Sequence, residues 1–138
     1  MGRTTNSFLI RGRLSGLNEY TKACRGNAYG ANNLKKANQQ IVKNALQDGL
    51  RHGFLHRVEK YPIQLRIVWY EANSRRDIDN VTFAKKFILD AMVEMGIIEN
   101  DSQKYVSGMR DTVLVDKHFP RIEVYIEEEE RQNAKSND

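Results

Sequence analysis

Three aspartates in the second half of the chain are the residues best suited to chemistry. Asp77 and Asp79 are separated by a single residue, and Asp101 follows about one helix length later. Carboxylates that converge on one point repel each other unless a cation lies between them, and Mg²⁺ or Mn²⁺ prefers such oxygen ligands together with waters. Arg75 and Arg76 directly precede the pair. Acidic groups for a metal beside basic groups for phosphate indicate phosphodiester cleavage by a metal-activated water.

Sequence patterns place the aspartate pair between a strand and a helix. Residues 61–70 alternate apolar and polar side chains, which predicts a strand. Apolar residues then recur at helical spacing over 80–95, and Gly96 ends the pattern. Either Asp79 or Asn80 is able to cap this helix. The pair is therefore expected where a strand is followed by a helix N-terminus.

The spacing of the aspartates predicts how they project. In extended backbone Asp77 and Asp79 share one face, with Ile78 pointing back into the core, so that one ion can meet both carboxylates. Asp101 is harder to place, because a helix over 80–95 rises about 24 Å at 1.5 Å per residue. Three arrangements would bring Asp101 close to an aspartate pair. The strand after the helix runs back toward Asp77 and Asp79, or the helix bends, or a symmetric dimer places Asp101 beside the aspartate pair of the other subunit.

A lysine on the same predicted helix is a further candidate. Lys86 lies seven residues after Asp79 and projects to nearly the same side, whereas Lys85 falls on a different face. An ammonium near a scissile phosphate stabilises developing charge. The ordinary alternative is a helix lysine paired with Asp90 at i+4, and spacing alone favours that alternative.

The rest of the chain alternates strands and helices. Residues 17–30, rich in Gly, Asn and cations, are expected to form a loop with a short helical turn capped by Asn18. Periodicity predicts four further elements: a strand over 8–14, a helix over 31–52, an extended segment over 104–115 and a strand over 121–126. This order describes an α+β fold in which a small mixed sheet packs against helices.

Length and composition indicate one soluble domain. The 138 residues suffice for a single core, expected over 1–127, and the acidic residues 128–138 are expected to be disordered. No apolar run approaches a membrane span and no signal segment begins the chain, so a cytoplasmic protein without a membrane partner is expected. The lone Cys24 fits a reducing compartment. Nothing in the chain indicates a small-molecule cofactor.

Charge is distributed unevenly. Residues 1–76 contain 14 Lys or Arg against 4 Asp or Glu, a net +10, while residues 77–138 contain 8 against 14, a net −6. A basic first half is expected of a surface that follows phosphates. The candidate DNA contacts are Arg11, Arg13, Asn18, Tyr20, Arg25, Lys35, Lys36, Arg75 and Arg76.

Three segments carry a family resemblance. They are Arg76-Asp77-Ile78-Asp79-Asn80, Lys86-Phe87-Ile88-Leu89-Asp90-Ala91-Met92 and Gly96-Ile97-Ile98-Glu99-Asn100-Asp101-Ser102-Gln103. In order, spacing and apolar framework the chain resembles the RusA-type Holliday junction resolvases of bacteria and their phages. The specific part covers about residues 74–126, and the segment from Gly12 to Tyr20 is more loosely similar.

The resemblance implies a homodimeric, Mg²⁺- or Mn²⁺-dependent endonuclease that makes paired nicks in four-way DNA junctions during recombination and repair. It implies Asp77, Asp79 and Asp101 as the metal-site carboxylates and Lys86 as the catalytic lysine. Two departures stand out: the distance from Asp79 to the lysine is a few residues longer than in the best-known member of the family, and Asn100 replaces a frequent second aspartate.

Two other functions fit part of the sequence. A catalytically inactive module that binds branched DNA needs only the basic surface. A metal-dependent phosphatase or nuclease for smaller substrates accounts for the carboxylates but leaves the net charge of +10 unexplained. Retention of all three aspartates and Lys86 favours the endonuclease.

Overall fold

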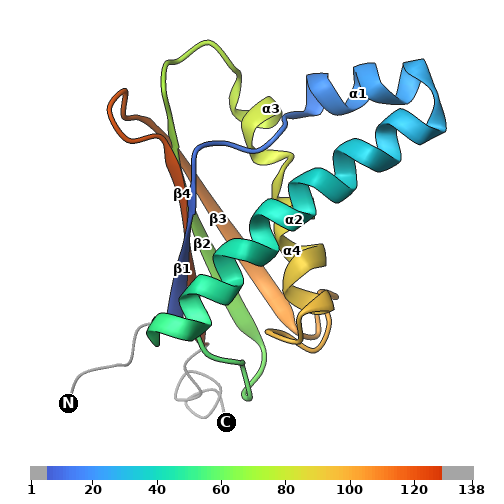
Figure 1. The fold of residues 1–138 in the computed structure, drawn as a ribbon. Helices are drawn as coiled ribbons and strands as arrows, with labels where there is room; N and C mark the ends of the chain where they lie inside the picture. Colours follow the sequence, from blue (N-terminus) through green and yellow to red (C-terminus); the bar gives the residue numbers. More distant parts are fainter. Residues whose placement is uncertain (1–5, 129–138) are drawn as a thin grey trace, which may run out of the picture.

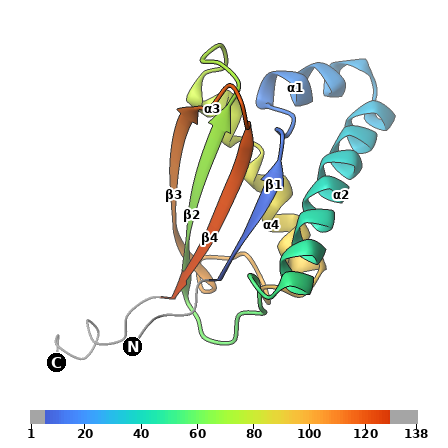
Figure 2. The ribbon, with the colours of Figure 1, turned by 60° about the vertical axis from the view of Figure 1, so that its left-hand side comes forward.

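A four-stranded sheet with its helices on one face forms the protein in the computed structural model, which describes residues 6–128 (Figures 1 and 2). The elements are, in chain order, β1 (Asn6–Arg11), α1 (Leu17–Gly26), α2 (Ala28–His52), β2 (Ile63–Glu71), α3 (Ile78–Thr82), α4 (Lys85–Glu94), β3 (Val106–Val115) and β4 (Arg121–Glu128). The predicted α+β class with a mixed sheet is confirmed.

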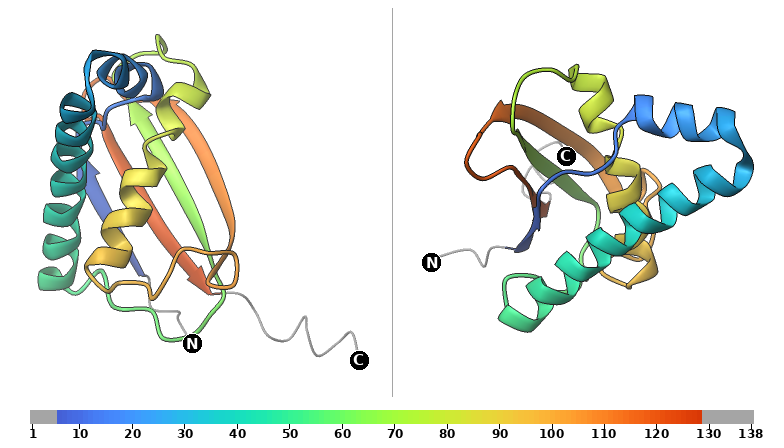
Figure 3. Two further views of the ribbon diagram at one scale, coloured as in Figure 1. Left: turned by 90° about the vertical axis from the view of Figure 1, so that its right-hand side faces the viewer. Right: turned by 45° about the horizontal axis from the view of Figure 1, so that its top comes forward.

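The strand order β1-β4-β2-β3 makes β1 and β3 the two edges of the sheet. Strand β4 runs antiparallel to both β1 and β2, while β2 and β3 are parallel. Parallel neighbours need a crossover connection, and α3 and α4 provide it. Because β2 leads up into α3 and β3 begins at the other end, the segments before β3 and after β2 lie at opposite ends of the sheet (Figure 3).

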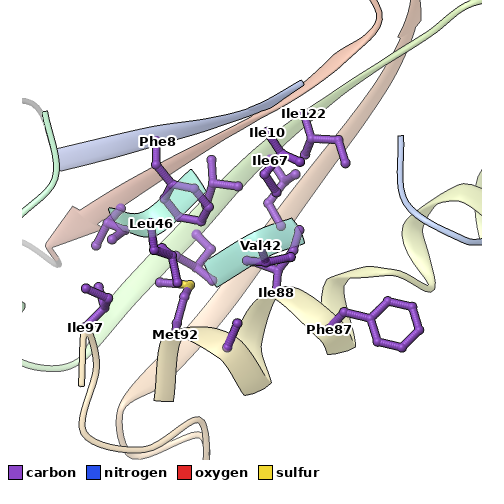
Figure 4. Close-up of a cluster of buried hydrophobic side chains, with 14 of the residues drawn as sticks. Phe8, Ile10, Val42, Leu46, Ile67, Phe87, Ile88, Met92, Ile97 and Ile122 are labelled. Carbon is purple, nitrogen blue, oxygen red and sulfur yellow. The ribbon is translucent and has the colours of Figure 1, made fainter. Parts of the chain in front are cut away.

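The core lies between the sheet and helices α2 and α4 (Figure 4). On β2 the alternating residues Ile63, Leu65, Ile67 and Trp69 are almost completely buried, which confirms the strand expected from their spacing. Each large apolar side chain buried in this way contributes about 1.5–3 kcal/mol. Burial of this face holds β2 in place, and the chain continues from the end of β2 into α3.

The helix expected over 80–95 is broken into α3 and α4. Backbone bonds between them close i to i−3 turns, from Ala84 to Val81, from Lys86 to Phe83 and from Phe87 to Ala84, which is the tighter 3₁₀ pattern. The Phe83 ring lies 5.2 Å from the ring of Tyr20 on α1. The break between α3 and α4 thus coincides with the packing of Phe83 against α1. The spacing of apolar residues along the sequence does not reveal this contact.

The loop expected over 17–30 is also wrong, because this stretch is helical. Helix α1 occupies most of it, and α2 starts at Ala28. The side chain of Asn27 accepts a 2.7 Å hydrogen bond from the Gly30 N–H and caps α2. Asn18 lies inside α1, whose N-cap position is Gly16, so Asn18 caps nothing.

The structure also bears on the predicted acidic tail and on the predicted lack of a membrane-spanning segment. Glu128, the first residue of the expected acidic tail, is the last residue of β4; the tail's other residues, 129–138, lie outside the described residues. Over residues 6–128, no helix has both the length and the apolar character required to cross a bilayer.

Candidate metal centre and nucleic-acid interface

The aspartate pair lies at the N-terminus of α3, after β2 has ended. Asp77 is the N-cap residue, with extended backbone at φ −68° and ψ 158°, and Asp79 lies in the first helical turn. Both side chains are exposed. Ile78 is 55% exposed, so the expectation that it points into the core is wrong. The reason is that helix α3 starts at Ile78 itself, which ends the two-residue alternation on which that expectation depended.

Neighbouring carboxylates are neutralised by cations, whereas those of Asp77 and Asp79 are not. Lys85 contacts Asp111 at 2.6 Å, and Arg121 contacts Asp116 at 2.8 Å. The hydrogen bond from Arg121 holds the pKa of the Asp116 carboxyl below its ordinary value. Within residues 6–128, the carboxylates of Asp77 and Asp79 make no hydrogen bond or ion pair. Two adjacent carboxylates are thus left available to a ligand.

Arg76 holds the chain just before the pair, and its side chain is mostly covered. Its Nε and Nη2 donate to the two carboxylate oxygens of Glu71 at 2.8 and 2.9 Å, and its Nη1 donates to the Leu14 carbonyl at 3.3 Å. Only 14% of the Arg76 side chain is exposed. The Arg76 guanidinium therefore anchors the segment that carries Asp77, and a contact of Arg76 with DNA stays a prediction.

A close backbone approach joins α1 to α3 beside this anchor. The Asn18 N–H donates to Oδ1 of Asn80 at 3.0 Å, so Asn80 links two helices and does not cap its own. A Cβ placed on Gly16 would lie 2.4 Å from the same oxygen. Only a residue without a side chain fits at Gly16, and this contact fixes α3 against the start of α1.

The two adjacent lysines differ clearly in their surroundings. Lys85 is held by Asp111, whose other oxygen accepts a 3.0 Å hydrogen bond from the Trp69 indole. Lys86 is exposed and has no ion pair within residues 6–128. The ordinary alternative, a Lys86–Asp90 pair, does not occur among the described contacts, where Asp90 lies 3.9 Å from Lys35.

Asp101 lies at the other end of the sheet from the aspartate pair. It precedes β3 in a segment whose Tyr105 carbonyl accepts from the N–H of Ile63, the first residue of β2. There it lines a cleft of about 400 Å³ together with Lys35, Asp90 and other residues of α2 and α4. No group of three His, Cys, Asp or Glu side chains within residues 6–128 is arranged to hold a metal ion. The three aspartates do not converge in one chain.

The candidate DNA contacts fall into two groups. Tyr20 packs on the rings of Phe83 and Phe87, and a hydrogen bond with Cys24 raises the pKa of its hydroxyl; a contact of Tyr20 with DNA stays a prediction. Most of the others are exposed, and Lys35 is half-buried at the cleft. Helices α1 and α2 form a projecting arm that carries several of them (Figure 1). Besides Tyr20 and Arg76, the predicted DNA contacts are Arg11, Arg13, Asn18, Arg25, Lys35, Lys36 and Arg75.

Sequence reasoning missed the residues that support the site. Glu71, Gly16 and Asp111 each act through a contact with a residue on another part of the chain, described above. No local spacing marks these contacts. The exception is Gly16, since a glycine directly before a helix is a recognisable N-cap residue.

Unpaired carboxylates at a helix start, beside a basic helical arm, are the arrangement expected of a protein that acts on nucleic acid with a metal ion. A family model described as Endodeoxyribonuclease RusA matches residues 17–127. The chain belongs to this family, which confirms the resemblance drawn from the motifs and makes the protein an endodeoxyribonuclease by family. A comparison with curated proteins found no match.

Proposed function

We propose that the protein is a metal-dependent endonuclease that resolves four-way DNA junctions by paired nicks, acting in the cytoplasm. The observation that carries the proposal is the pair Asp77 and Asp79, exposed and without a described cation partner while neighbouring carboxylates are neutralised. Membership of the RusA family supplies the DNA substrate class. The basic first half of the chain supports the same substrate.

Asp77 and Asp79 are the residues that would hold Mg²⁺ or Mn²⁺. Their donor set suits the ion, because Mg²⁺ commonly binds to one or two carboxylates together with substrate phosphates and waters. When bound, the ion supplies charge neutralisation at the phosphate and a more acidic water. Arg76, fixed by Glu71, keeps the segment that carries these carboxylates against the sheet.

Lys86 is proposed to act on the charge that develops on the phosphate. Its ammonium is exposed, two residues after the break that separates α3 from α4. Lys85, the other lysine considered for this role, is already bound by Asp111. A cation held near a developing oxyanion lowers the barrier because that charge is greater in the transition state than in the ground state.

DNA binding is assigned to basic residues of the arm and of the loop before α3. Arg25, Lys35 and Lys36 lie on α1 and α2, and Arg75 directly precedes the anchored Arg76. Contacts of this kind position the backbone and carry no base sequence information. Binding should therefore weaken log-linearly with salt as counterions are released.

Homodimer formation is part of the proposal, because one chain keeps Asp101 apart from Asp77 and Asp79. In a two-fold dimer each site would combine the aspartate pair of one subunit with Asp101 of the other, and two such sites would cut two symmetry-related strands. No backbone rearrangement of the single chain is then required.

The experiment compares a synthetic four-way junction with a duplex of the same sequence, in Mg²⁺ and in chelator. The parent protein should nick only the junction and only with the metal. Asp79→Asn should bind the junction but nick it at least about 100-fold more slowly, whereas Asp48→Asn, an exposed aspartate on α2, should cut like the parent. Equal nicking by Asp79→Asn and the parent would reject the site. Junction binding without any nicking by the parent would favour the inactive module.

A further inference from the structure

We propose that Tyr61 is a positioning residue for Asp101, because its hydroxyl holds the segment of chain that carries the Asp101 carboxylate. That Asp101 serves a metal ion is part of the proposed function, on which the inference rests. The hold itself follows from contacts within the single chain. Tyr61 lies two residues before β2 begins, at the end of the sheet where Asp101 lies.

The carboxylate of Asp101 is unpaired, like those of the aspartate pair. It is exposed and makes no hydrogen bond or ion pair within residues 6–128. The other two carboxylates that line its cleft are compensated, since Asp90 lies 3.9 Å from Lys35 and Glu94 forms an ion pair with Lys43. No side-chain contact therefore fixes the Asp101 carboxylate, and its place depends on the backbone that carries it.

The Tyr61 hydroxyl joins that backbone to the segment before β2. The Glu99 N–H donates to the hydroxyl oxygen at 2.9 Å, and the hydroxyl donates to the Val58 carbonyl at 3.2 Å. A tyrosine hydroxyl both donates and accepts, and here both capacities are used. In the described part of the chain, no other hydrogen bond ties residues 99–104 to a segment distant in sequence.

The aromatic ring of Tyr61 contacts the other end of the same segment. It lies against the ring of Tyr105, with centroids 5.1 Å apart and planes at 83°. The Tyr105 carbonyl accepts a 2.8 Å hydrogen bond from the first residue of β2. Between these two holds, Oδ1 of Asn100 accepts from the Ser102 N–H at 2.9 Å, which closes a turn around Asp101. One side chain thus contacts the segment on both sides of Asp101.

A ligand on a segment that is already ordered binds an ion more tightly, because less conformational entropy is lost on binding. Tyr61→Phe removes the hydroxyl and keeps the ring. Tyr105→Phe is the matched control, since it alters the other ring of the same pair, is half-buried like Tyr61, and has a hydroxyl without a hydrogen bond within residues 6–128. The two variants therefore differ in the contact with Glu99.

Hydrogen exchange measured by NMR tests the hold without metal or DNA. In Tyr61→Phe the Glu99 amide should exchange about tenfold faster than in the parent, because it loses its acceptor and the segment opens more often. In Tyr105→Phe it should exchange at the parent rate. A parent exchange rate for Glu99 in Tyr61→Phe would overturn the proposal.

Mn²⁺ binding, followed by electron paramagnetic resonance of the free ion, tests the consequence for Asp101. Tyr61→Phe should raise the Mn²⁺ dissociation constant about three- to tenfold, and Tyr105→Phe should leave it unchanged. Added to Asp101→Asn, Tyr61→Phe should have no further effect, because it acts through the missing carboxylate. An unchanged constant in Tyr61→Phe, or a further loss in the Asp101→Asn background, rejects the positioning role.

Single-turnover nicking separates positioning from a direct part in the reaction. Tyr61→Phe should need about three- to tenfold more Mn²⁺ for half-maximal nicking and should reach nearly the parent rate at saturation, whereas Asp101→Asn should not recover. A low rate of Tyr61→Phe at saturating Mn²⁺ contradicts a role through position alone. A parent protein that binds Mn²⁺ but does not cut junctions would instead refute the proposed function, and the exchange and binding results would still decide the role of Tyr61.

Discussion

At the scale of the residue, the candidate site is recognised by what its carboxylates lack. Glu71, Asp111 and Asp116 are each held by an arginine or lysine, so their charge is already compensated. Asp77 and Asp79 have no such compensation among the described residues, and their mutual repulsion is lowest when a cation is bound between them. Their exposure keeps that repulsion small in the absence of a ligand.

Lys85 and Lys86 provide a matched pair for the first prediction at this scale. Lys86→Ala should lower the single-turnover nicking rate about 100-fold, because a charge on the transition state loses its cation, and should leave the melting temperature unchanged since the side chain is exposed. Lys85→Ala should lower stability by about 1–2 kcal/mol, because Asp111, whose side chain is only 15% exposed, loses its partner. Its nicking rate per folded molecule should stay near that of the parent. The reverse pattern would assign the catalytic role to Lys85.

At the scale of the element, the sequence predicted those helices and strands whose apolar residues recur at a regular spacing. The spacing of apolar residues gave β2, most of α2, and β4, because each buries one regular face. It did not reveal α1, which has no buried residue and is capped by glycine. It also missed the break after Thr82, where the rings of Tyr20 and Phe83 meet across 63 residues of sequence. Asp77 and Asp79 were identified as a pair, but the shared face predicted for them depended on extended backbone, which ends where α3 begins between them.

The contact between α1 and α3 carries a prediction of its own. Gly16→Ala should push Asn80 away, since the new Cβ would lie 2.4 Å from its side-chain oxygen and 2.8 Å from its carbonyl oxygen. We expect a loss of stability of about 1–3 kcal/mol and, at a temperature where the variant is folded, at least tenfold slower nicking because the segment with Asp77 and Asp79 moves. Calorimetry and single-turnover nicking measure the two effects.

Gly26→Ala is the control for that substitution. Gly26 ends the same helix, and a Cβ there meets no atom within 4 Å. It should cut like the parent and be equally or slightly more stable. If Gly16→Ala nicks at the parent rate, the contact between α1 and α3 does not position the aspartates.

At the scale of the whole molecule, the parallel pairing of β2 and β3 decides how the site is completed. Because the crossover through α3 and α4 returns the chain to the start of the sheet, Asp101 necessarily lies at the end remote from Asp77 and Asp79. The sequence left three solutions open. The strand after α4 does run back, but it begins after Asp101; the broken helix does not bring the residues together either. The proposed dimer, in which two subunits share each site, is compatible with this topology.

Heterodimers test the shared site directly. Asp79→Asn and Asp101→Asn homodimers should both be inactive on junctions. A heterodimer of the two, purified through different tags, should regain one complete site, formed by the unchanged aspartate pair of one subunit and the unchanged Asp101 of the other. It should nick at about half the parent rate, because one of two equivalent sites is intact, and it should nick one strand without making the paired cut. Gel analysis of strand-specific labels measures both properties.

A second heterodimer excludes a general effect of mixing subunits. When Asp79→Asn is combined with Asp77→Asn, each shared site contains one altered residue from its own pair, so no complete site forms and nicking should stay at the level of the inactive homodimers. If Asp101 acted within its own chain, the first heterodimer would be as inactive as the second. Equal inactivity of the two heterodimers, with dimer formation verified by sedimentation, would therefore reject the shared site while leaving the aspartate pair as the metal ligand.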